Sequence, residues 1–152
     1  MKLNPVSAAD LEIDMLHPPG PGLYRWLLAS FLLGKRIRAS VALRAYRILV
    51  HQHGLDTPAK LRQCPHRELV RWLGQAGYAR YDESTARRLR LLGARLDDEM
   101  PARLEALEEG RDGLQGIGLW LLTFEGIGPK TLEIFMREAA PVLETLVTKR
   151  PG

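Results

Sequence analysis

A Gly-x-Gly turn followed by a lysine is the feature of this chain best suited to chemistry. Gly126 and Gly128 flank Ile127, Pro129 comes next, and Lys130 stands two positions after the second glycine. Glycine permits tight backbone turns, and proline suits the first turn of a helix. The amides from Gly126 to Lys130 are therefore expected at a helix N-terminus, where they attract anions. On a basic chain we expect a nucleic-acid phosphate; the alternative is a structural turn between core helices.

Helical patterns surround this turn and continue through the whole chain. Apolar residues recur at helical spacing on both sides of the turn, and no segment alternates with period two. Pro101 and Pro141 are each expected to open a short helix of their own. The sequence predicts an all-α bundle in a single domain spanning residues 1–152. The predicted helices with both ends defined are 7–16 (capped by Ser7 and Asp10), 23–33, 38–53, 114–123 and 131–139. Further helices are predicted to begin near 58, near 65, at 82 or 84, near 101 and near 141.

Composition narrows the function classes. The chain has 152 residues and is 45% hydrophobic, enough for a core, with no run long and apolar enough to cross a bilayer. The N-terminus lacks the layout of a secretory signal, so we expect a cytoplasmic, nucleoid-associated protein. The single Cys64 excludes an intramolecular disulfide and a cysteine-ligated iron–sulfur cluster.

Charge is distributed unevenly along the chain. The net charge is +4, yet residues 15–55 carry no acidic residue and residues 97–112 are rich in acid. A one-sided basic surface favours binding of a polyanion, and ordinary surface solvation is the alternative. The basic residues of the first segment are Arg25, Lys35, Arg36, Arg38, Arg44 and Arg47.

Three stretches together resemble a known family. The glycine turn with Lys130 and Thr131, the run 32–36 and the run 77–81 are similar to the helix-hairpin-helix DNA glycosylase superfamily, in particular the endonuclease III type. The resemblance extends from about residue 24 to residue 141. It implies a six-helix barrel acting on double-stranded DNA, damaged or abasic, in a shortened form. It also implies that Gly126, Ile127, Gly128, Lys130 and Thr131 contact the DNA backbone.

The resemblance gives Lys130 a catalytic role. In bifunctional relatives of this type, the lysine at this position attacks the sugar C1′ and forms a Schiff base, which requires a neutral amine. The alternative is a lysine that only binds phosphate. An aspartate about eighteen residues later supports base departure in those enzymes, but here that position is Thr148. We therefore expect abasic-site lyase chemistry or plain binding rather than competent glycosylase activity.

The two upstream runs supply further DNA-binding candidates. By resemblance, Arg36 fills the gap left by a flipped nucleotide, with Lys35 and Arg38 beside it. Tyr78 matches a residue that wedges between bases, and Arg80 follows it. The alternatives are a solvated helix end at Arg36 and a capped loop with half-buried aromatic residues near Tyr78.

The resemblance also implies a monovalent cation held by main-chain carbonyls, which would belong to Leu122, Phe124 and Ile127. No other cofactor is expected. The sequence thus predicts a DNA-binding protein of the base-excision-repair type. The alternatives are a non-catalytic helix-hairpin-helix module and a protein-interaction domain that dimerises.

Overall fold

The computed structural model describes residues 5–16 and 19–148, and within these ranges every regular element is helical. The all-α prediction is therefore confirmed. None of the helices in these ranges combines the length and the apolar character that crossing a bilayer would need.

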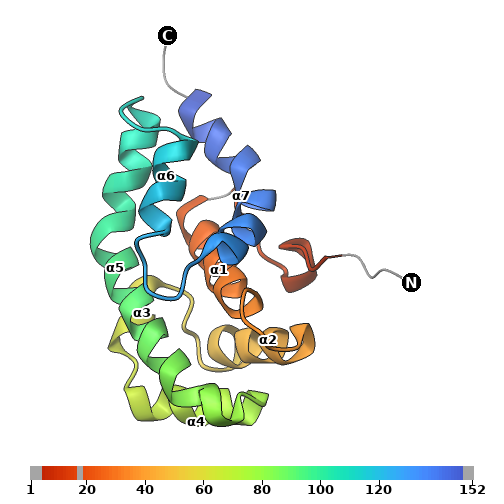
Figure 1. Ribbon diagram of the computed structural model, residues 1–152. Helices are drawn as coiled ribbons and strands as arrows, with labels where there is room; N and C mark the ends of the chain where they lie inside the picture. Colours follow the sequence, from red (N-terminus) through yellow and green to blue (C-terminus); the bar gives the residue numbers. More distant parts are fainter. Residues whose placement is uncertain (1–4, 17–18, 149–152) are drawn as a thin grey trace.

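Helix α1 (Pro19–Leu33) forms the centre of the molecule. It is apolar almost all round, and it is buried from Gly22 to Leu32 apart from the half-buried Arg25. Figure 1 shows α5 (Asp82–Glu108) on one side of α1 and α7 (Pro129–Thr148) on the other. The indole Nε1 of Trp26 donates a hydrogen bond to the Phe135 carbonyl at 3.1 Å, which ties α1 to α7.

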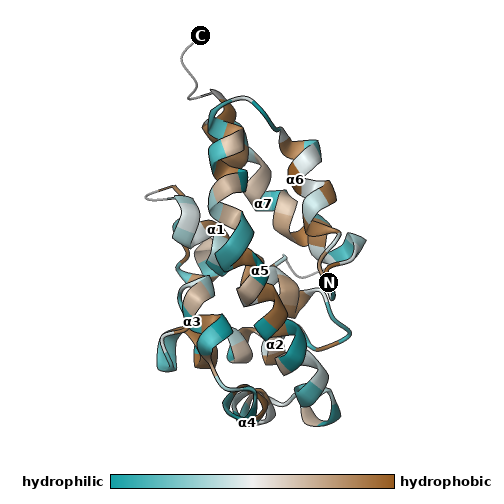
Figure 2. Ribbon diagram, turned by 90° about the vertical axis from the view of Figure 1, so that its left-hand side faces the viewer, coloured by the Kyte–Doolittle hydropathy of each residue, from teal (hydrophilic) through white to brown (hydrophobic). Residues whose placement is uncertain are grey.

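A group of shorter helices covers the end of the molecule far from the C-terminal turns of α7 (Figure 1). The predicted helix 38–53 exists as α2 (Ala39–Tyr46) followed by the π-helical segment η2 (Arg47–Gln52). Next come α3 (Pro58–Gln63), capped by the Thr57 side chain, and α4 (His66–Ala76), which ends at Gly77 with a φ of 111°. Figure 2 shows apolar and hydrophilic residues side by side on α4 and α5, as expected for surface helices.

Two predicted helix starts are wrong. Pro101 lies inside α5 and Pro141 lies inside α7, so neither proline opens a new helix. Each proline is exposed, as is the residue four positions earlier, Asp97 or Arg137. The carbonyl that loses its amide partner therefore lies on the exposed side of the helix, where water can bond to it. The packing of the rest of the helix keeps it continuous across the proline.

The N-terminal helix is shorter than predicted, although its cap is correct. The Ser7 amide donates to the Asp10 carboxylate at 2.9 Å, and the Asp10 amide donates to the Ser7 hydroxyl at 3.2 Å. The helix is only the 3-10 turn η1 (Ala9–Leu11), because Glu12 turns left-handed with a φ of 59°. The Ala8 amide bonds to the carboxylate of Glu138 on α7, so tertiary contacts set the path of this segment.

Candidate nucleic-acid interface

The turn of residues 122–128 joins α6 (Leu114–Leu121) to α7 and is held by its own apolar residues (Figure 1). Phe124 and Ile127 are buried, and the ring of Phe124 meets Trp120 edge to face at 5.2 Å. The Ile127 amide donates to the Phe124 carbonyl at 3.2 Å. These contacts, with the hydrogen bonds from the amides of Thr123 and Phe124 to the carbonyls of Trp120 and Leu121, fix the shape of the turn.

Gly126 is required by the geometry of the turn. Its φ is 93°, and a Cβ atom there would lie 2.8 Å from Cε2 of Phe31. Both features exclude other side chains, since the backbone is left-handed and presses on the α1 ring. Gly128 differs, because a Cβ atom at that position would meet nothing within 4 Å.

Unpaired amides gather where α7 begins. The Leu132 amide bonds to the Gly128 carbonyl at 3.0 Å, whereas the amides of Gly128, Lys130 and Thr131 have no hydrogen-bond acceptor among the described residues. Such amides carry the partial positive charge of a helix N-terminus. An open groove of about 410 Å³ runs past this point, and its lining is Gly34, Lys35, Gly126, Ile127, Gly128, Pro129, Lys130 and Thr131. We call it the turn groove.

The end of α1 meets the turn at close range. A Cβ atom on Gly34 would lie 2.1 Å from the Thr131 hydroxyl oxygen, so only glycine allows this approach. The ammonium of Lys35 donates a hydrogen bond to the Gly126 carbonyl and lies 4.5 Å from the centre of the Phe31 ring. Burial, with a smaller effect of the nearby Arg88 charge, lowers the pKa of Lys35. The structure thus places Lys35 against the turn, which its hydrogen bond helps to hold in place.

A second groove adjoins the first across Lys35. Its volume is about 220 Å³, and we call it the arginine groove. Tyr81 is 49% exposed there, and the Arg80 guanidinium lies 5.4 Å from the centre of its ring. The Nε atom of Arg88 is buried and has no hydrogen-bond partner among the described residues. The groove is lined by Lys35, Arg36, Ile37, Tyr81, Ser84, Thr85 and Arg88, so it combines an exposed aromatic ring with several cations.

The assignment of Tyr78 as a wedge residue is wrong for this conformation. Tyr78 is 1% exposed, and its hydroxyl is buried without a partner in the described part of the chain. Burial raises the pKa of this phenol. The left-handed Gly77 ends α4 and directs Tyr78 into the core, while the 3-10 turn η3 (Ala79–Tyr81) leaves Tyr81 outside.

Thr131 also differs from the prediction of direct DNA contact. Thr131 is 2% exposed as a whole residue and its side chain packs against Gly34, so it offers almost no surface to a ligand. The DNA contact predicted for Arg38 stays a prediction, since Arg38 is exposed at the start of α2 and lines neither groove. Lys130, by contrast, is exposed on the first turn of α7 and makes no ion pair within the described residues.

The position expected to hold a catalytic aspartate is remote from Lys130. Helix α7 runs without interruption from Pro129 to Thr148. At a rise of 1.5 Å per residue, position 148 lies roughly 27 Å along the helix from position 130. The chain therefore does not fold back at this point, and an aspartate at position 148 would not reach the turn groove.

The predicted cation site remains a prediction. Of its three carbonyls, that of Phe124 already accepts the Ile127 amide at 3.2 Å, which leaves it one lone pair for an ion. Leu122 and Ile127 stand at the two ends of the same turn. Within the ranges the structure covers, no three side chains of His, Cys, Asp or Glu cluster to hold a metal ion.

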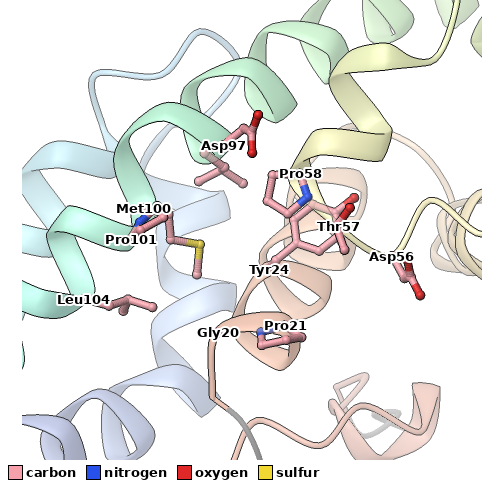
Figure 3. A pocket seen from close by; sticks show the side chains of 11 residues that line it. Gly20, Pro21, Tyr24, Asp56, Thr57, Pro58, Asp97, Met100, Pro101 and Leu104 are labelled. Carbon is pink, nitrogen blue, oxygen red and sulfur yellow. The ribbon is translucent and has the colours of Figure 1, made fainter.

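A separate cavity of about 340 Å³ lies between α1, α3 and α5 and is mainly apolar. Figure 3 shows Met100 and Leu104 of α5 on one side of it and Pro21 and Tyr24 of α1 on the other. The Asp56 carboxylate at its rim pairs with Lys60 at 2.9 Å. Its lining contains no lysine, arginine or histidine that could bind an anion.

Sequence reasoning missed the contribution of α5 to the candidate interface. Ser84 and Arg88 line the arginine groove, and Arg87 pairs with Glu125 of the turn at 2.6 Å. The spacing of Ser84 and Arg88 places them on one face of a helix, which is readable from sequence. That this face meets the end of α1 is a tertiary fact without a local signal.

Comparison of this chain with models of protein families, with curated proteins and with solved structures found no match. The resemblance therefore rests on the residues themselves and stays a prediction.

Proposed function

We propose that this chain binds the phosphate backbone of double-stranded DNA through the turn groove and the arginine groove. The observation that carries the proposal is the pair of unpaired amides at Gly128 and Lys130, with the exposed Lys130 side chain beside them. Amides at a helix N-terminus bind phosphate oxygens without reading base sequence. The proposal includes a helix-hairpin-helix role for α6, the turn and α7.

The charge of the two grooves supports this proposal. Their linings contain Lys35, Arg36, Arg88 and Lys130 and no carboxylate. The one acidic residue of the turn, Glu125, is paired with Arg87, which lowers the pKa of Glu125. A surface of one sign attracts a polyanion and loses affinity as salt rises.

A second candidate function adds chemistry to binding. An exposed lysine amine next to bound DNA can react with the aldehyde of an abasic site, and Lys130 is the amine that the resemblance indicates. Glycosidic-bond cleavage is not proposed, because the long α7 carries position 148 away from the groove. A strong preference for abasic over intact duplex supports the repair role; equal affinity supports the non-catalytic module.

Fluorescence anisotropy with a labelled duplex tests the binding proposal. We expect binding at about 50 mM salt that weakens steeply towards about 200 mM. Lys130→Glu should weaken binding by about tenfold, or ~1.4 kcal/mol. Arg67→Glu is the control, since Arg67 is an exposed cation that lines neither groove and makes no ion pair within the described residues, and the affinity of this variant should change little. Absence of binding at low salt, or equal losses in both variants, contradicts the proposal.

A further inference from the structure

We propose that Lys35 is the amine that forms a Schiff base with the aldehyde of an abasic site, in place of Lys130. The inference rests on the proposed function, because it takes the DNA to be bound at the turn groove. It concerns which side chain of that site reacts.

The position of Lys35 gives it access to both grooves. Its side chain lines the turn groove and also the arginine groove, and it is the one residue common to the two linings. The close approach of Gly34 to Thr131 brings the end of α1 against the start of α7. A DNA strand held by the amides of Gly128 and Lys130 therefore passes the Lys35 amine.

Burial and a neighbouring cation favour a neutral Lys35 amine. Its side chain is half-buried and Arg88 approaches from α5, whereas the Phe31 ring under the nitrogen acts in the opposite direction and favours the ammonium form. Burial first, and the Arg88 charge second, lower the pKa of Lys35. The neighbouring Arg36 is a further cation, and neither groove lining contains a carboxylate that would stabilise the ammonium form. Lys130, in contrast, projects into solvent from the first turn of α7.

The Gly126 carbonyl orients the amine for attack. It accepts one hydrogen bond from the Lys35 nitrogen. A neutral amine has two hydrogens and one lone pair, so it can keep this bond while the lone pair points elsewhere. The remaining hydrogen of a protonated imine can then donate to the same carbonyl, which stabilises the charged product.

The reaction is balanced without a further reagent. The Lys35 nitrogen attacks C1′ of the ring-opened sugar, and a proton moves from nitrogen to the former aldehyde oxygen. The resulting carbinolamine loses this oxygen as water and leaves a C=N bond between lysine and sugar. No oxidant or metal is required, and borohydride added by the experimenter reduces the imine to a stable secondary amine.

Trapping with borohydride on an abasic duplex, followed by peptide mapping of the adduct, tests the inference in the wild-type chain. We expect the adduct on Lys35. Lys35→Arg, which keeps the charge and a donor for Gly126, should lower adduct yield by about tenfold or more. Lys60→Arg, the matched control at an exposed lysine outside both grooves, should leave the yield unchanged. An adduct mapped to Lys130, or an undiminished yield in Lys35→Arg, overturns the inference.

Two measurements separate failure of the inference from failure of the proposed function. Anisotropy reports duplex binding by itself: binding without any adduct overturns the Lys35 proposal and leaves DNA binding intact, whereas absence of binding removes both. NMR titration of the Lys35 side chain needs no DNA. The amine should titrate below the ordinary lysine range, and titration within that range counts against Lys35.

Discussion

At the scale of single residues, both the backbone geometry and the packing of the turn require glycine at position 126. Its left-handed φ of 93° and its contact with Phe31 both depend on the missing side chain. Gly126→Ala should therefore destabilise the fold by about 1–3 kcal/mol, since the strained φ adds to a clash at 2.8 Å. Urea unfolding followed by tryptophan fluorescence measures this loss.

The same substitution at Gly74 is the control. Gly74 lies inside α4, is exposed, and a Cβ atom there would approach nothing nearer than the Asp82 carboxylate at 3.8 Å. Alanine is the better helix former, so Gly74→Ala should raise stability by about 0.5–1 kcal/mol. Equal effects of the two substitutions would show that the left-handed turn is not formed.

Tyr78 provides the second prediction at this scale. Its buried hydroxyl has no partner among the described residues, so Tyr78→Phe removes an unsatisfied polar group and keeps the ring. The variant should be as stable as the wild type or up to about 1 kcal/mol more stable. Its affinity for duplex DNA should not change, because the ring faces the core. A loss of affinity would restore the wedge role that the sequence suggested.

The two tyrosines mark a limit of sequence reasoning at the residue scale. Tyr78 and Tyr81 both follow a helix stop at Gly77, and nothing local distinguishes them. The left-handed turn at Gly77 and the 3-10 turn η3 decide that Tyr78 enters the core and Tyr81 remains 49% exposed. The sequence predicted an aromatic loop here, but it selected the wrong ring for solvent.

At the scale of elements, a charged contact joins α5 to α6. The Glu99 carboxylate accepts hydrogen bonds from Arg95 at 2.8 and 2.9 Å and from the Trp120 indole at 2.9 Å. The Arg95 contact is the main cause that lowers the pKa of Glu99 to about 2. The pair lies beside the Phe124 ring, 4.0 Å from the Arg95 guanidinium, so it also supports the turn.

This contact makes a prediction about pH. A carboxyl with a depressed folded-state pKa stabilises the fold above its unfolded value near 4.3, and this contribution disappears as pH falls through about 2. The stability difference between wild type and Glu99→Gln should therefore shrink between about pH 4.5 and pH 2. It should not exceed about 1 kcal/mol, since the Glu99 side chain is 36% exposed and solvent screens the pair. Urea unfolding at several pH values measures it; a pH-independent difference contradicts the assignment.

The sequence predicts which segments form helices better than it predicts where each helix begins and ends. Periodic apolar residues and the stop at Gly77 define α4 correctly, and the Thr57 cap with Pro58 defines the start of α3. Pro101 failed as a start signal, because the packing of α5 outweighs one missing hydrogen bond. The predicted continuation of the first helix beyond Leu11 was wrong because Ala8 bonds to Glu138, 130 positions away, and no local pattern contains that contact.

At the scale of the whole molecule, the candidate interface is assembled from three distant segments. The end of α1 at Lys35, the start of α5 at Ser84 and Arg88, and the turn at Gly126 meet around two adjoining grooves. The sequence alone indicated candidate residues in the end of α1 and in the turn, but none on α5. Their convergence, with Lys35 and Gly126 bonded across 91 positions, required the fold.

The measurement that tests the central claim most directly is an NMR titration of the ¹⁵N-labelled chain with a short DNA duplex at low salt. The account predicts that the amide signals of Gly128 and Lys130 shift most, and that these shifts recede when salt is raised. Unchanged signals at these two amides, with shifts confined to residues outside both grooves, would contradict it.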